Sequence, residues 1–177
     1  MPILEIRRHV ERADLKNNES SLSPAGRNLA QAIAKRAGPY NLVLASPLPR
    51  AKETAQLIAG RLDGVDAGLL PEMGGVIGDR IFGEMHTLAD WSGVLRERED
   101  ARAFAVEQLQ TWARIAERVS DRERVLAVSH GGIIELPALA LAQRLGTRLE
   151  GRAFGYGEGV LVTYASGVPV KIEPLRV

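Results

Sequence analysis

Three short stretches of this sequence place histidine, arginine or serine directly after an apolar run. They contain Arg8-His9, Ser46 with Arg50 four residues later, and Ser129-His130. A guanidinium group offers planar pairs of donors that fit phosphate oxygens, and an imidazole can donate hydrogen bonds, transfer protons or attack phosphorus. These residue types predict an anion site that also contains a candidate nucleophile.

The apolar runs before these residues are short enough to be buried strands, and they alternate with helical patterns. In such folds ligands bind outside the carboxyl ends of parallel strands, so we expect the three stretches to meet at one edge of a sheet. Each stretch alone has an ordinary structural explanation. Arg-His at a strand end is typical of solvated surface, SPLPR of a helix start with a capping serine, and HGG of a turn. Their shared position is what favours a functional site.

The elements that must position these residues predict an α/β fold. Ser23-Pro24 supplies an N-cap and a proline for the first helical position. Between residues 63 and 90, glycines interrupt both the helical and the strand spacing of apolar residues. We therefore expect a loop or lid region at about 63–100, in which 65–70 could hold a short strand. The other expected elements are strands at 3–6, 42–45 and 124–128, helices at 24–37, after 46–47, at 88–119 in two pieces and at 133–145, and a closing hairpin at 160–164 and 168–172.

Strands that alternate with helices predict a three-layer α/β/α sandwich around a largely parallel mixed sheet. The length of 177 residues suits a single domain spanning 1–177. Lys and Arg total 23 against 22 for Asp and Glu, which is too even for a general nucleic-acid or membrane binder. No apolar run approaches the roughly 20 residues of a transmembrane helix, and the absence of cysteine excludes thiolate chemistry and disulfides. We therefore expect a cytoplasmic enzyme or binding protein.

The order and spacing of the motifs resemble the histidine phosphatase superfamily, also called phosphoglycerate mutase-like. Arg8-His9-Val10 is similar to its opening Arg-His-Gly, and Leu22-Ser23-Pro24-Ala25-Gly26 to its Leu-Thr-x-x-Gly segment. The stretch from Ser46 through Arg50 to Thr54-Ala55 resembles its serine-proline, arginine and threonine-alanine signature, and Ser129-His130-Gly131 its late His-Gly. The resemblance spans nearly the whole chain.

The resemblance implies a phosphatase that hydrolyses a small phosphomonoester through a phosphohistidine on His9. Arg8, Arg50 and His130 would bind the phosphoryl oxygens, and no metal or cofactor is implied. Guanidinium charge beside His9 would keep its ring neutral. The resemblance leaves open a phosphoglycerate mutase-like phosphotransferase, a phosphohistidine protein phosphatase acting on a phosphoprotein, and a non-catalytic phosphate-binding protein.

Two features depart from the family pattern. Val10 stands where a small residue is usual, so the turn after His9 must accept a β-branched side chain. The family's general acid lies in a Leu-x-Glu stretch four residues before a glycine. Glu72 keeps Leu-x-Glu without that glycine, whereas Asp79 keeps the offset to Gly83 but is an aspartate. We favour Asp79 and keep Glu72 as the alternative.

Several other residues near these motifs have weaker claims. Strand alternation would point Arg7 away from Arg8, to a structural or rim position. Asn17, Glu135 and Glu158 are minor candidates for the site, and His86 is expected to help cap the following helix.

Overall fold

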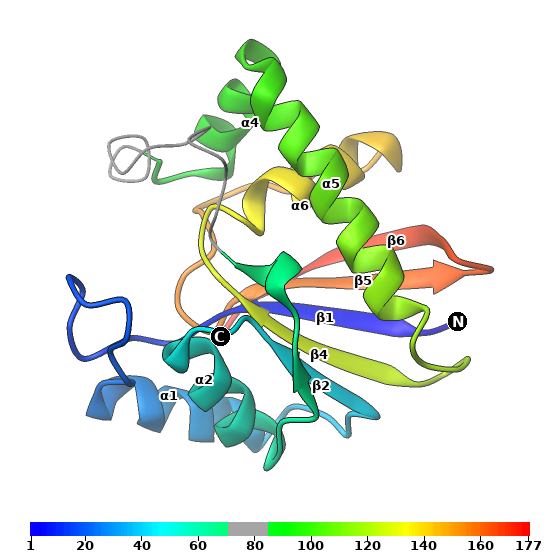
Figure 1. Ribbon diagram of the computed structural model, residues 1–177. Coiled ribbons are helices and arrows are strands. Elements are labelled where there is room, and N and C mark those ends of the chain that lie inside the picture. Colours follow the sequence, from blue (N-terminus) through cyan, green and yellow to red (C-terminus); the bar gives the residue numbers. More distant parts are fainter. Residues whose placement is uncertain (71–84) are drawn as a thin grey trace.

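A mixed sheet forms the centre of the computed structural model, which describes residues 1–70 and 85–177 (Figure 1). Within these residues six strands pair in the order β3-β2-β4-β1-β5-β6. Strands β1 to β4 run parallel to one another. Strand β5 is antiparallel to β1, and β6 is antiparallel to β5. The strands are β1 (Ile3–Arg8), β2 (Leu42–Ala45), β3 (Gly64–Val65), β4 (Arg124–Ser129), β5 (Gly159–Ala165) and β6 (Val168–Leu175).

Helices cover both faces of this sheet, which confirms the expected α/β/α layers (Figure 1). One face carries α1 (Pro24–Ala34) and α2 (Pro49–Ala59). The other carries α4 (Leu88–Glu97), α5 (Glu99–Ala116), α6 (Glu135–Arg144) and the short 3-10 helix η1 (Ala67–Leu69). Alternate side chains of β4 enter the two cores, Leu126 and Val128 on the α1–α2 side and Val125 and Ala127 on the other. The central strand β4 is thus buried on both faces.

The two helices of the first face begin in different ways. At α1, the Ser23 hydroxyl accepts a hydrogen bond from the amide of Gly26 at 3.0 Å, as the sequence predicts. At α2, the N-cap residue is Leu48 and no side chain caps the helix. Ser46 therefore does not cap the helix, and the alternative explanation of this stretch as a helix start with a capping serine is wrong. Pro49 moves the helix start beyond Ser46, whose hydroxyl lies 2.6 Å from the Nε2 atom of His130.

The region expected as a loop or lid at about 63–100 is helical from Leu88 onward. Thr87 and Asp90 form a capping box that starts α4, and α4 and α5 are the expected two helical pieces. The expected strand at 65–70 is limited to β3, followed by η1. Both candidate acids, Glu72 and Asp79, lie outside the described residues. None of the helices in the described ranges is long and apolar enough to cross a membrane.

Candidate active site

The residues predicted from the three motifs meet in one cleft at the carboxyl ends of β1, β2 and β4. The cleft has a volume of about 620 Å³, and Arg8, His9, Arg50 and His130 all line it. Backbone hydrogen bonds hold the strand ends in register, from the amide of His9 to Ser129 O at 2.9 Å and from the amide of Ser46 to Val128 O at 3.0 Å. The expected convergence of the motifs is confirmed.

The hydrogen bonds of His9 define which ring nitrogen can react. Its Nδ1 atom lies 2.7 Å from the backbone oxygen of Val10, which can only accept, so Nδ1 carries the proton. The Nε2 atom is then unprotonated, and it accepts a hydrogen bond from Arg50 Nε at 3.2 Å. This network assigns the lone pair of the ring to Nε2, on the side of Arg50.

Burial is the main reason that His9 stays neutral. The side chain is 7% exposed, and desolvation lowers the pKa of His9 to about 3. The hydrogen bond to the Val10 carbonyl opposes this change, and the guanidinium charges of Arg50 and Arg8 lower the pKa further. The effect of the arginines expected from the sequence is present but smaller than that of burial.

His130 is the second buried histidine of the cleft. Its ring centroid lies 5.1 Å from that of His9 in an edge-to-face arrangement. Burial, followed by the electrostatic influence of His9 and Arg50, lowers the pKa of His130 well below its usual range. The Ser46 hydroxyl lies 2.6 Å from Nε2, and Nδ1 is buried with no partner among the described residues. Nδ1 is therefore the ring nitrogen of His130 that the described part of the protein leaves without a hydrogen bond.

The two predicted arginines are held by backbone oxygens. Arg50 donates from Nη1 to Asn18 O at 3.0 Å, and burial lowers its pKa to about 10. Arg8 donates from Nη1 to Phe154 O at 2.9 Å, and its guanidinium carbon lies 4.7 Å from the ring centre of Tyr156. Carbonyl oxygens and an aromatic face orient guanidinium groups without neutralising them, so both arginines keep their charge for an anion.

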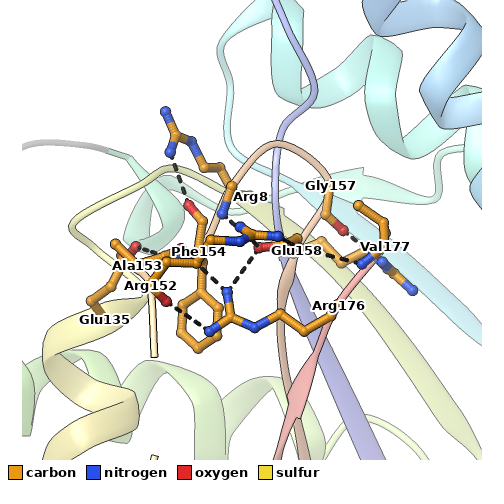
Figure 2. Close-up of polar contacts among 11 residues, drawn as sticks. Arg8, Glu135, Arg152, Ala153, Phe154, Gly157, Glu158, Arg176 and Val177 are labelled. Carbon is orange, nitrogen blue, oxygen red and sulfur yellow. Dashed lines mark hydrogen bonds and ion pairs between the residues drawn. The ribbon is translucent and has the colours of Figure 1, made fainter. Parts of the chain in front are cut away.

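Glu135 connects the turn after His130 to the segment that holds Arg8 (Figure 2). Its carboxylate accepts from the amide of Gly132 at 2.7 Å and from that of Phe154 at 3.0 Å. The residue is 1% exposed, and burial raises its pKa. Glu135 lines the cleft as expected, but both carboxylate oxygens bind backbone amides.

Glu158, the other minor carboxylate candidate, is directed away from the cleft lining. Figure 2 shows it between Arg152 and Arg176, with which it forms ion pairs of 2.5 and 2.8 Å. It also accepts from the amides of Gly155 and Val177, and these hydrogen bonds and ion pairs lower its pKa to about 2 against the effect of burial. Glu158 therefore fixes the 152–158 segment, and it is not among the described residues that line the cleft.

The structure explains how valine can follow His9. Val10 is fully buried in the core between α1, α2 and the sheet, and its amide donates to Thr54 Oγ1 at 3.2 Å. Its backbone does not have a positive φ, so this turn does not require glycine.

Arg7 points away from the cleft and is only 5% exposed. It pairs with Glu5 and donates to Gly157 O at 2.6 Å, so the structural alternative is right and the rim alternative is wrong.

Some residues of the cleft were missed by the sequence reasoning. The cleft lining includes Arg12 and Tyr156, and it contains Asn18 in place of the expected Asn17. A third arginine within LEIRRHVERAD was a signal for Arg12, whereas Tyr156 stands in a glycine-rich segment without a recognisable pattern. His86 is exposed, and its backbone amide donates to the helix-capping carboxylate of Asp90.

The two buried histidines, His9 and His130, both line this cleft. A larger groove of about 1150 Å³ lies between α4, α5 and α6, and the residues that line it include no histidine. In the described part of the chain, no group of three or more His, Cys, Asp or Glu side chains is arranged to hold a metal ion.

Comparison with known proteins identifies the family. The model of the histidine phosphatase superfamily (branch 1) matches residues 7–167. The chain belongs to this superfamily. No curated protein sequence matches it.

Solved structures confirm the phosphoglycerate mutase-like fold. Phosphoglycerate mutase from Bacillus anthracis strain Sterne is similar with a TM-score of 0.70 at 17% identity, covering 98% of this chain and 92% of that chain. Phosphoserine phosphatase from Entamoeba histolytica, in complex with 3-phosphoglyceric acid, has a TM-score of 0.62 at 20% identity, and the match covers 100% of this chain and 98% of that chain. A mycobacterial glucosyl-3-phosphoglycerate phosphatase with inorganic phosphate has a TM-score of 0.60 at 21% identity, and the match covers 97% of this chain and 94% of that chain.

Proposed function

We propose that this protein is a phosphatase that hydrolyses a phosphomonoester through a phosphohistidine on Nε2 of His9. The observation that carries the proposal is the state of His9. The ring is buried and neutral, and its unprotonated nitrogen is Nε2, which accepts a hydrogen bond from Arg50 and lies in the same cleft as Arg8 and His130. A neutral imidazole surrounded by cationic donors suits nucleophilic attack on a phosphorus that carries negative oxygens. Family membership and the phosphatases among the structural neighbours support the same activity.

In the first chemical step, the Nε2 lone pair forms a bond to phosphorus as the bond between phosphorus and the ester oxygen breaks. Arg8, Arg50 and His130 would stabilise the charge on the three phosphoryl oxygens. The departing oxygen takes a proton from a carboxylic acid, which we assign to Asp79 with Glu72 as the alternative. Water then attacks phosphorus, the electron pair of the N–P bond returns to Nε2, and the carboxylate takes the water's proton.

The test is hydrolysis of p-nitrophenyl phosphate between pH 4 and pH 8 by the protein and by a His9→Ala variant. We expect turnover to depend on His9, and the nucleophile to stay neutral over this whole range because its pKa is about 3. The matched control is His86→Ala, which removes the exposed histidine. Equal turnover by the protein and by His9→Ala would refute the nucleophile and favour a non-catalytic phosphate-binding protein.

Two further measurements define the reaction. A phosphoenzyme trapped by acid-free quenching should be alkali-stable and acid-labile, and absent from His9→Ala. Separate Asp79→Asn and Glu72→Gln variants identify the acid, because loss of the true acid slows substrates with poor leaving groups most. Phosphate delivered to an added alcohol in preference to water would favour a phosphotransferase instead.

A further inference from the structure

A third guanidinium group lies at the mouth of the cleft. Arg12 lines the cleft together with Arg8 and Arg50, on the segment that joins β1 to α1. Asn18 connects it to Arg50, because Arg50 donates to the backbone oxygen of Asn18 at 3.0 Å and Arg12 to its side-chain oxygen at 3.2 Å. The positive charge of Arg12 lowers the pKa of His9, of His130 and of Arg50, which agrees with this close placement.

The protein orients Arg12 without neutralising it. Its Nη1 donates to Asn17 O at 3.3 Å and to Asn18, and its Nη2 donates to Leu15 O, all of them uncharged acceptors. A guanidinium has five N–H groups, so two remain without an acceptor in the described part of the chain. The ion pairs found among residues 1–70 and 85–177 include none of Arg8, Arg12 and Arg50.

The cleft has more guanidinium groups than one phosphoryl group requires, and its lining carboxylate, Glu135, is bound by two backbone amides. A phosphomonoester carries a charge of about −1.5 to −2 near neutral pH, which two guanidinium groups balance. Arg50 donates to Nε2 of His9, whereas Arg12 is half-buried at the rim, next to the exposed Leu15 and Asn18. An uncompensated, pre-oriented guanidinium in this position suits a second anionic group of the ligand.

We propose that Arg12 binds a second anionic group of the substrate, so that the preferred phosphomonoesters carry a carboxylate or another phosphate close to the phosphoryl group that His9 attacks. This inference rests on the proposed phosphatase function. Arg12 is a specificity-determining residue, and it distinguishes substrates by charge at the cleft mouth rather than by chemistry at phosphorus.

The experiment compares matched substrates that differ in one anionic group. The effect of a carboxylate as the second anionic group is measured as the ratio of kcat/KM for 3-phosphoglycerate to that for glycerol 3-phosphate. The effect of a phosphate as the second anionic group is measured as the ratio of kcat/KM for fructose 1,6-bisphosphate to that for fructose 6-phosphate. We expect the protein to prefer the doubly anionic member of at least one pair, and Arg12→Gln to reduce that preference about ten- to hundredfold. The control is Arg36→Gln, which removes an exposed arginine just beyond the C-terminal end of α1 and should retain the preference.

Two results would overturn the inference. If Arg12→Gln lowers kcat/KM equally for both members of each pair, Arg12 acts on the shared phosphoryl group. If the ratios do not change, or the protein shows no preference, Arg12 does not select the substrate.

Binding separates this inference from the proposed function. Calorimetry with both substrate pairs is performed on His9→Ala and on His9→Ala combined with Arg12→Gln. Tighter binding of the doubly anionic member of either pair that is lost with Arg12 supports the inference even if turnover fails to depend on His9. Equal binding of both members of each pair by His9→Ala overturns it even if the protein is a phosphatase.

Discussion

Burial of a neutral histidine makes the stability of this protein depend on pH in a way that can be calculated. The pKa of His9 is about 3 in the folded chain against 6.5 for an ordinary histidine. Between these values the unfolded chain binds a proton that the folded chain does not. The stabilising effect is therefore complete above pH 6.5 and is lost as the pH falls toward 3. Integration between pH 7 and pH 5 gives a decrease of about 2 kcal/mol in the free energy of unfolding from His9 alone.

The measurement is urea unfolding of the protein and of a His9→Asn variant at pH 7 and pH 5. Asparagine retains an N–H for the Val10 carbonyl but does not titrate, so we expect the variant to lose about 2 kcal/mol less than the protein over this interval. His86→Asn, at the exposed histidine, should show the same pH dependence as the unsubstituted protein. An equal loss in the protein and in His9→Asn would refute the conclusion that burial keeps this ring neutral.

Three further substitutions test the support of the cleft, each by chemical unfolding. Glu158→Gln should reduce the free energy of unfolding by about 3 kcal/mol at pH 7, because it leaves Arg152 and Arg176 without their carboxylate. The difference in stability between the protein and this variant should decrease as the pH falls from 4.5 toward 2, where Glu158 itself becomes protonated. Val10→Ala should cost about 2 kcal/mol by removing two fully buried methyl groups, and a change below about 0.5 kcal/mol would contradict its assignment to the core. Thr54→Val should cost about 1–3 kcal/mol because the buried Val10 amide loses its acceptor, whereas Thr54→Ser should retain most of the stability.

The fold could be predicted because its elements depend on local signals. Apolar runs of four to six residues mark strands buried on both faces, and Ser23-Pro24 marks the start of α1 through its hydroxyl and fixed φ. The position of four site residues followed from a general rule, that parallel strands end at one edge of a sheet. Ser46 shows the limit of such local signals. The same Ser-Pro pattern can cap a helix or place a hydroxyl on a distant histidine, and only the tertiary structure decides between them.

The parts of the site that could not be predicted come from irregular segments. Arg12 and Tyr156 reach the cleft because the 11–22 and 152–158 segments fold back toward the sheet edge, stabilised by backbone hydrogen bonds such as that from the amide of Gly157 to Arg8 O at 3.1 Å. Hydrophobic periodicity contains no information about such paths. The sequence also does not decide between Asp79 and Glu72 as the acid, because Glu72 keeps Leu-x-Glu without the glycine, whereas Asp79 keeps the offset to Gly83 but is an aspartate.

The hydrogen bond between Arg50 and His9 has a consequence for the order of events in the proposed reaction. Arg50 Nε donates to the same lone pair that would attack phosphorus, so Nε2 carries a hydrogen bond before substrate binds. A bound phosphoryl group would compete for this donor and so free Nε2. Once bonded to phosphorus, Nε2 could not accept a hydrogen bond until the N–P bond is cleaved. In the proposed mechanism, substrate binding would therefore expose the lone pair of Nε2, and loss of the phosphoryl group would restore its hydrogen bond to Arg50.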